Sequence, residues 1–304
     1  MKKRYIIACL LTLAITSCKK TVLTQLSNPA TGVQLKFFHA APGVPALDAF
    51  VNGTQVTPTV NASLTDKALP TSVVTGYSYL GFFPGSNYSV VTSGNTNIKI
   101  ATSTPVPALV SKQTVTPATT VGSITQSTVD GSAYSVFTIG LPGSSTVGLN
   151  TIMVPDKFPE IVTGKAYIRL AYLIPNGAAV DIQGTYTPTG STAVTKTIIS
   201  NISYPNVTDF VAVDVNAVSS TSYTFQLYLA GTITKLGTVS AAIALTPGRF
   251  YTIIGRGLAA DYVVPGVGIT LKASTRPTLP VSDPTTKFPE IYFNPPGITS
   301  YTNK

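Results

Sequence analysis

The chain has 304 residues, of which 44% are hydrophobic and 10% charged, with two cysteines and one histidine. This length suits two domains of ordinary size, each able to bury a core of its own. The formal net charge is +9, or +6 without the three positive residues at positions 2–4. The remaining lysines and arginines are scattered, which excludes the concentrated basic surface of a nucleic-acid-binding protein. We therefore expect no nucleic-acid partner.

The N-terminus has the pattern of an export signal. Three positive residues at 2–4 precede an apolar stretch, 5–15, that is too short to cross a bilayer. The next residues, Ile-Thr-Ser-Cys at 15–18, resemble a lipobox, the processing signal of bacterial lipoproteins, although leucine is commonest where Ile15 stands. The resemblance implies cleavage before Cys18 and acylation of Cys18. An ordinary secretory signal cut near Ser17 is the alternative.

A lipidated Cys18 would leave the mature chain without a free thiol, because Cys9 departs with the signal. Disulfides, a cysteine nucleophile and soft metal sites would then be excluded. Lipid chains hold a protein on a membrane without a spanning segment. We expect a lipid-anchored protein of the bacterial cell envelope, at the outer membrane, with the periplasmic or surface-facing side left open.

From Val33 onward the composition is that of an all-β protein, rich in Thr, Ser, Val, Ile and Tyr. Apolar and polar residues alternate over 87–93, 210–215 and 222–229, which predicts half-buried strands. Turn signals recur between the apolar runs at Asn52-Gly53, Pro84-Gly85, Asp130-Gly131 and Pro247-Gly248. Short strands with frequent turns favour a β-sandwich.

The sequence also repeats itself. Residues 31–48 align with 163–181 if one insertion is allowed, and 132–140 align with 249–257. The aligned pairs include Lys36 and Arg169, His39 and Tyr172, Pro42 and Pro175, and Asp48 and Asp181. The pentapeptide Lys-Phe-Pro-Glu-Ile occurs twice, at 157–161 and 287–291. These repeats predict two domains of common design, each closed by the same five residues.

The expected organisation is a lipoprotein signal peptide at 1–17, lipidated Cys18 with a flexible tether to 31, a first β-sandwich at 32–156, a connector at 157–164, a second β-sandwich at 165–277 and a Pro-rich C-terminal segment at 278–304.

The opening of the first unit resembles a known family. Its strand runs into His-Ala-Ala-Pro-Gly-Val-Pro-Ala-Leu-Asp-Ala-Phe-Val-Asn-Gly, which looks like the start of the domain of unknown function 4397. The matching positions are His39, Ala40, Pro42, Asp48, Asn52 and Gly53. Ala41 replaces the typical serine, and the second unit, which matches more weakly, has Tyr172 in place of the histidine. The resemblance implies tandem immunoglobulin-like sandwiches in secreted proteins and lipoproteins, with no established activity.

We interpret the residues that recur in the two repeats as a structural motif. A metal ligand or general base is lost when histidine becomes tyrosine, whereas a planar side chain with one polar tip can be exchanged. We therefore interpret His39 and Tyr172 as structural. For Asp48 and Asp181 we expect carboxylates that accept backbone N–H bonds at a strand entry; ligands for a bound ion are the alternative.

No catalytic constellation emerges from the sequence. One histidine permits a Ser-His-Asp arrangement only around His39, and no nucleotide or metal motif is present. The closest acid pairs are Asp156 with Glu160 and Asp209 with Asp214, and the first pair lies in a Pro-containing connector where solvated charge is expected. We predict no enzymatic activity, no cofactor and no metal.

The repeated pentapeptide suggests a packing role. We expect each copy to dock, through Phe158 and Phe288, on the domain that precedes it, while binding of the tail to another molecule is the alternative. The sequence thus predicts a non-catalytic binding or structural module whose partners are the membrane and a glycan or an envelope protein. A surface adhesin or pilus-like subunit that assembles by strand addition is the first alternative. A polysaccharide-acting enzyme is the second.

Overall fold

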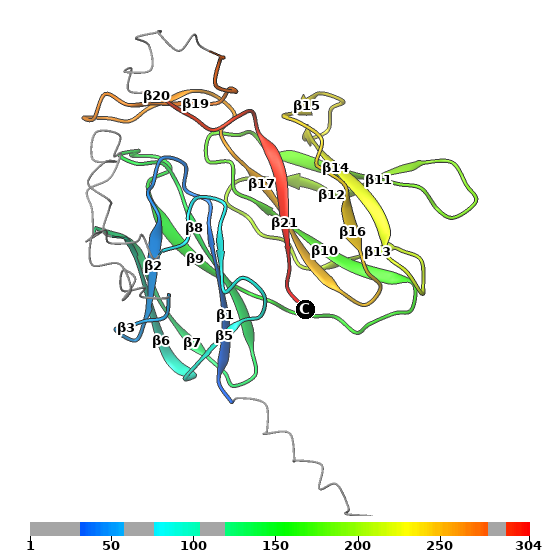
Figure 1. Ribbon diagram of the computed structural model, residues 1–304, viewed down its shortest axis with the longest axis horizontal. Coiled ribbons are helices and arrows are strands. Elements are labelled where there is room, and N and C mark those ends of the chain that lie inside the picture. The colour runs from blue at the N-terminus through cyan, green and yellow to red at the C-terminus, as the bar shows by residue number, and fades with distance from the viewer. Residues whose placement is uncertain (1–30, 58–75, 104–118, 279–289) are drawn as a thin grey trace, which may run out of the picture. The chain divides into compact units, whose positions relative to one another are not determined.

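Every regular element in the residues that the structure describes is a β-strand, in agreement with the predicted all-β class. The computed structural model describes residues 31–57, 76–103, 119–278 and 290–304 (Figure 1). Cys18, the signal segment and Phe288 lie outside these ranges. We refer to β1 through β9 as the N-terminal half and to β10 through β21 as the C-terminal half.

The N-terminal half contains two sheets. The first inner sheet has the order β4 (Phe82–Phe83), β1 (Val33–His39), β8 (Ala133–Ile139) and β9 (Asn150–Pro155), and β5 (Ser89–Val91) also pairs with β1. The first outer sheet has the order β3 (Thr54–Gln55), β2 (Leu47–Val51), β6 (Gly94–Thr102) and β7 (Thr120–Thr128).

The C-terminal half follows the same plan. The second inner sheet has the order β13 (Val211–Asp214), β10 (Lys165–Tyr172), β17 (Phe250–Arg256) and β21 (Gly297–Thr302). The second outer sheet has the order β12 (Val194–Ile202), β11 (Val180–Tyr186), β14 (Thr221–Leu229) and β15 (Lys235–Leu236), and β16 (Ile243–Leu245) also pairs with β14. A small sheet joins β18 (Tyr262–Val263), β19 (Thr270–Lys272) and β20 (Glu290–Tyr292). The three stretches with predicted alternation correspond to β5, β13 and β14.

The inner sheets show that the sequence repeat is also a structural repeat. In each half the opening strand runs parallel to a strand much later in the chain: β1 pairs with β8, 99 residues on, and β10 pairs with β17, 83 residues on. The register is the same, because Lys36 lies opposite Ser135 and Arg169 lies opposite Thr252. An antiparallel strand then completes each inner sheet, β9 beside β8 and β21 beside β17.

Three hydrophobic clusters separate these sheets. One lies within the N-terminal half and includes Leu35, Phe37 and Ile98, and a second lies within the C-terminal half around Ile168 and Phe225. The third lies between the two inner sheets and contains Phe38, Phe137, Ala171, Ile254 and Tyr301. The inner strands are therefore covered on both faces, which explains why all seven residues of β8 are buried.

The C-terminal segment belongs to the fold over its described part. Strand β20 runs parallel to β19, and β21 pairs with β17 through six residue pairs. Residues 297–302 are therefore the edge strand of the second inner sheet rather than an extension beyond the expected domain end at 277.

Candidate functional site

The single histidine is enclosed and fully hydrogen-bonded. His39 has no exposed surface; its Nε2 donates to the carbonyls of Val44 and Pro45, at 3.2 and 3.0 Å, and its Nδ1 accepts the N–H of Ala41 at 3.3 Å. Burial lowers the pKa of His39 to about 4, although the two carbonyl bonds oppose this shift. The neutral ring thus holds the loop after β1 in place.

We expect His39 to make the protein sensitive to mild acid. Because its pKa is about 4 in the folded state and 6.5 when unfolded, the unfolded chain alone binds a proton between these values. Stability is therefore complete above pH 6.5 and falls as the pH drops toward 4, with a loss of about 2 kcal/mol between pH 7 and pH 5. Urea unfolding at both pH values measures the loss. His39→Gln, which keeps a donor without titrating, should remove it; equal wild-type stability at the two pH values would contradict the assignment.

Tyr172 occupies the equivalent place in the C-terminal half. It is buried, and its hydroxyl donates to the carbonyl of Ala178 at 2.7 Å in the loop that follows β10. Burial raises the pKa of Tyr172, so the hydroxyl stays protonated. Histidine and tyrosine thus make the same kind of contact, from the end of the opening strand to the next loop. The buried Pro42 and Pro175 lie in these two loops.

The two recurring aspartates have different partners. Asp181 accepts the backbone N–H groups of Asn201 and Gly231, at 2.7 and 2.9 Å. Asp48 accepts the hydroxyls of Thr57 and Ser103, at 3.0 and 2.9 Å. Each carboxylate is therefore occupied by protein donors that tie neighbouring segments together.

The predicted turn at Asn52-Gly53 joins β2 to β3 as a two-residue hairpin. Its φ angles are 49° and 82°, so both residues are left-handed, which suits the Asn-Gly dipeptide. The side-chain oxygen of Asn52 also accepts the N–H of Asn97 at 2.9 Å. The motif therefore fixes the hairpin and its neighbour β6.

Phe158 packs on the half that follows it, so the expected docking on the preceding domain is wrong. Its ring centroid lies 4.8 Å from that of Phe250 and 5.5 Å from that of Phe210, both in the C-terminal half. The two pentapeptides also hold different positions. Lys157 follows β9 as Lys304 follows β21, whereas the second copy precedes β21 and places Ile291 in β20. The five shared letters therefore do not close equivalent domains.

Replacing Phe158 should destabilise the C-terminal half. The ring is half-buried, so Phe158→Ala is expected to cost about 2 kcal/mol, less than the loss at a fully buried phenylalanine. Urea unfolding measures this against Val218→Ala, whose side chain is 91% exposed and whose loss should stay below about 0.5 kcal/mol. Equal unfolding midpoints for the two variants would refute the packing role.

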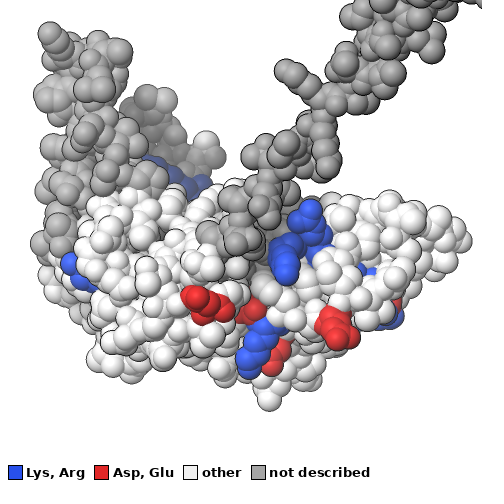
Figure 2. Space-filling view, turned by 90° about the horizontal axis from the view of Figure 1, so that it is seen from below, with Lys and Arg blue, Asp and Glu red and all other residues white. Residues whose placement is uncertain are grey.

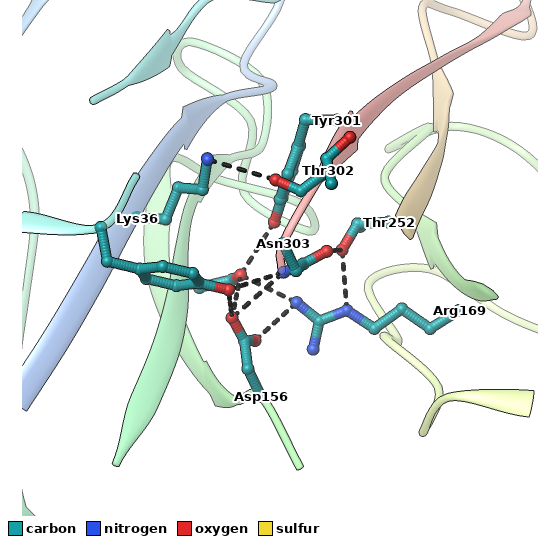
Figure 3. Close-up of polar contacts among 9 residues, drawn as sticks. Lys36, Asp156, Arg169, Thr252, Tyr301, Thr302 and Asn303 are labelled. Atoms are coloured by element: carbon teal, nitrogen blue, oxygen red, sulfur yellow. Dashed lines mark hydrogen bonds and ion pairs between the residues drawn. The ribbon is translucent and has the colours of Figure 1, made fainter. Parts of the chain in front are cut away.

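The largest polar arrangement lies between the two inner sheets (Figure 3). We call it the junction cluster; it comprises Lys36, Tyr88, Ser135, Asp156, Arg169, Thr252, Tyr301 and Asn303. At its centre Arg169 donates from Nη2 to Asp156 at 2.6 Å and to Ser135 at 2.8 Å, and from Nε to Thr252 at 2.9 Å. The side chains of Arg169 and Asp156 are 1% and 0% exposed, so the ion pair is sealed from solvent.

Three further donors form hydrogen bonds with the carboxylate of Asp156. Its Oδ2 accepts hydrogen bonds from the hydroxyls of Tyr88 and Ser135 and from the amide of Asn303, at 2.5, 3.0 and 3.1 Å. Asn303 in turn accepts the hydroxyl of Thr252 at 2.7 Å. Residues from both halves therefore share one closed network, which is the arrangement a buried charge needs to be tolerated.

Lys36 is held beside this network by carbonyls and aromatic rings. Its ammonium donates to the carbonyls of Ser86 and Thr302, at 2.7 and 3.3 Å. It also lies 5.4 to 5.5 Å from the ring centroids of Phe82, Tyr88 and Tyr301. Such cation–π contacts stabilise a partly desolvated cation.

Charge and burial set the protonation states in the cluster. Burial lowers the pKa of Lys36, and the charge of Asp156 opposes the shift. Burial also acts to lower the pKa of Arg169, but attraction and hydrogen bonding from Asp156, together with those from Tyr301, outweigh it and raise the pKa. Burial, reinforced by Asp156, raises the pKa of Tyr88, which keeps this phenol a neutral donor. The charged and polar groups of the cluster are therefore bound to one another.

The junction cluster was only partly foreseeable. The repeat aligned Lys36 with Arg169 and Ser135 with Thr252, and the strand pairing adds Asp156 and Asn303 as equivalents, each directly after the last inner strand. The expectation that Asp156 is a solvated connector residue is wrong, since Asp156 is buried. The sequence repeat could have located Asp156, because Asp156 and Asn303 hold equivalent positions in the two halves, as Lys36 and Arg169 do.

Open surface suited to a ligand lies elsewhere, around Tyr186 at the end of β11. The hydroxyl hollow is a cavity of about 360 Å³ lined by residues 185–187, 189, 216, 219–222 and 224. The lysine hollow, about 220 Å³, also has Tyr186 in its wall and contains Asp214 between Lys165 and Lys196, at 2.5 and 3.2 Å. These lysines lower the pKa of Asp214 through their hydrogen bonds.

On one face of the described part of the molecule, charged side chains of both signs are spread among uncharged residues (Figure 2). Lys and Arg side chains stand among uncharged residues and beside Asp and Glu on the face shown in Figure 2. Across the described ranges, no three His, Cys, Asp or Glu side chains come together in a way that could hold a metal ion. No helix there is long and apolar enough to cross a membrane.

Comparison with known proteins identifies a family over part of the chain. No curated protein matches the chain. Residues 33–183 match the family described as "Domain of unknown function (DUF4397)". The match begins at β1, passes the expected boundary at 156 and ends in β11, and it assigns no tandem second copy. The chain therefore contains a DUF4397 domain over residues 33–183.

Proposed function

We propose that the protein is a non-catalytic binding or structural module of the bacterial envelope, anchored at the outer membrane by lipid on Cys18. In this proposal the two halves are tandem immunoglobulin-like sandwiches carried on a tether. The observation that carries the non-catalytic role is the sealed junction cluster. Its carboxylate and guanidinium, which would be reactive groups in an open site, are 0% and 1% exposed and bind each other.

The junction also supports a role as a rigid unit. The charged pair, the hydroxyls of Ser135 and Thr252 and the apolar contacts around Tyr301 link the two inner sheets. Two domains joined by a solvated connector would move independently. A joined pair instead presents its outer sheets in one fixed arrangement, which suits binding or scaffolding.

Metabolic labelling and protease shaving of intact cells test the anchor and its side. The wild-type protein should incorporate radiolabelled palmitate and fractionate with membranes, and Cys18→Ala should do neither. Cleavage by protease added to intact cells would place the module on the surface, and protection until the outer membrane is broken would place it in the periplasm. A wild-type protein that takes up no label refutes the anchor.

A surface adhesin or pilus-like subunit is the second candidate, and one observation favours it. Strand β7 is nine residues long, carries no charged residue, and pairs only with β6 among the described strands. An uncharged edge of this length can accept an added strand. In the second outer sheet, the edge strand β12 carries Lys196, a charge that discourages pairing. Analytical ultracentrifugation over a hundredfold range of protein concentration tests this candidate. A subunit that assembles should form oligomers as the concentration rises, and a monomer at every concentration rules out self-assembly.

A polysaccharide-acting enzyme has less support. It would need two carboxylates facing each other across an open cleft. Of the acid pairs in the sequence, Asp156 is enclosed by Arg169 and Ser135, and Asp214 is bound by two lysines.

A further inference from the structure

The hydroxyl hollow has an unusual lining for a protein surface. All ten residues that form it carry a hydroxyl or a carboxamide group, and none is charged. Its volume of about 360 Å³ falls within the usual range of small-ligand sites. We propose that this hollow binds an uncharged saccharide. This inference rests on the proposed binding role, but not on the lipid anchor.

Part of the lining is fixed by the protein. The N–H of Asn216 bonds the hydroxyl of Thr221 at 2.8 Å, and the side-chain oxygen of Asn216 accepts the N–H of Val218 at 2.9 Å. The hydroxyl of Thr185 bonds that of Thr195 at 2.8 Å. These bonds hold the walls in one conformation, which reduces the entropy that a ligand must overcome.

Another part of the lining is free to bind. The hydroxyls of Thr187, Ser222 and Thr224 make no hydrogen bond within the described part of the chain, and the amide group of Asn216 has unused donors. A hydroxyl both donates and accepts, so it can pair with the hydroxyls of a sugar in either sense. Several such groups around one cavity can therefore bind a ligand that is polar on all sides.

Tyr186 supplies an aromatic surface at the boundary of the hollow. Its ring stacks on that of Tyr223 with centroids 4.6 Å apart and planes at 16°, which restrains its orientation. It lines both the hydroxyl hollow and the lysine hollow. Its hydroxyl donates to Asp214 at 3.4 Å, so Tyr186 offers the hollow its apolar ring, which suits the C–H groups of a sugar.

The charges around the hollow argue against other ligand classes. An anionic ligand would need a free cation, but the nearby Lys165 and Lys196 are both bound to Asp214. A peptide would need an apolar pocket for an anchoring side chain or an open strand edge. The lining offers neither, because β11 and β14 pair with each other through Thr185 and Thr224.

Saturation-transfer NMR on the full-length protein tests the proposal. The probes are cellohexaose, maltohexaose and fully N-acetylated chitohexaose, which are uncharged, with hexagalacturonic acid as the charged comparison. Lauryldimethylamine oxide solubilises the protein without the sugar headgroups of maltoside detergents. We expect saturation transfer to at least one neutral hexaose and none to the charged one. We also expect Ser222→Arg, which puts a bulky charge in the hollow, to weaken binding by at least about tenfold.

Ser127→Arg is the matched control, because Ser127 is also an exposed serine on an outer-sheet strand, β7, but lies outside the hollow. It should leave saccharide binding unchanged. No transfer to any neutral hexaose, or binding that survives Ser222→Arg, overturns the proposal. Palmitate labelling separates this result from the anchor: a labelled protein without sugar binding refutes the saccharide site alone, and an unlabelled protein with sugar binding refutes the anchor alone.

Discussion

Asp156→Ala should destabilise the protein by about 4 kcal/mol, the largest loss that we expect from a single substitution. The change removes the one carboxylate that binds Arg169 within the described ranges and leaves a guanidinium that is 1% exposed without this counter-charge. It also removes the acceptor for Tyr88, Ser135 and Asn303. Urea unfolding followed by far-ultraviolet circular dichroism measures the loss.

Two further variants separate the buried pair from charge in general. Asp214→Ala also removes a carboxylate with cationic partners, but its side chain is 46% exposed and the expected loss is below about 1 kcal/mol. Asp156→Leu combined with Arg169→Met removes the uncompensated charge and should recover part of the stability, because Tyr88, Ser135 and Asn303 still lack their acceptor. A loss at Asp156 no greater than that at Asp214 would show that the buried pair contributes little.

Deleting residues 297–304 should prevent the C-terminal half from folding. The deletion removes the edge strand β21 and with it Ile298 and Tyr301, two buried side chains worth together about 6 kcal/mol. It also removes Asn303 from the junction cluster. This loss is comparable to the whole stability of a typical domain. Limited proteolysis should show a protected N-terminal half and rapid cleavage after residue 164.

The alternative for the tail gives the opposite result. If the C-terminal segment served only to bind another molecule, the deletion would leave the unfolding transition of the isolated protein unchanged. Tyr301→Phe is the matched control, since it keeps the ring between the inner sheets and removes only the hydroxyl that bonds Ser135. We expect a loss of about 1 kcal/mol for this variant.

The strand content of the protein could be predicted because it follows from local patterns. Alternation identified β5, β13 and β14, and the Asn52-Gly53 turn predicted the hairpin between β2 and β3. The packing of the two inner sheets against each other could not be predicted in this way. Alternation of apolar and polar residues identifies a strand with one buried and one exposed face. Strands β1 and β10 are buried on both faces, so their sequences show no such alternation and do not indicate what covers the second face.

Asp156 and Phe158 illustrate the same limit. Both stand in a proline-containing connector, which is locally typical of solvent-exposed chain. Their surroundings are created by segments distant in sequence: Arg169 and Asn303 around Asp156, and Phe210 and Phe250 around Phe158. Identical letters in the two pentapeptides therefore carry no information about which surface each one contacts.

The place of the last strand in each half has a consequence for the order of folding. During synthesis β1 must wait for β8, and β10 must wait for β17 and then for β21, which completes the same sheet. Because Asn303 completes the network around Asp156, a growing chain cannot close the junction cluster until residue 303 has left the ribosome. A chain that has been made only as far as β20 therefore lacks both the edge strand β21 and the closed network around Asp156.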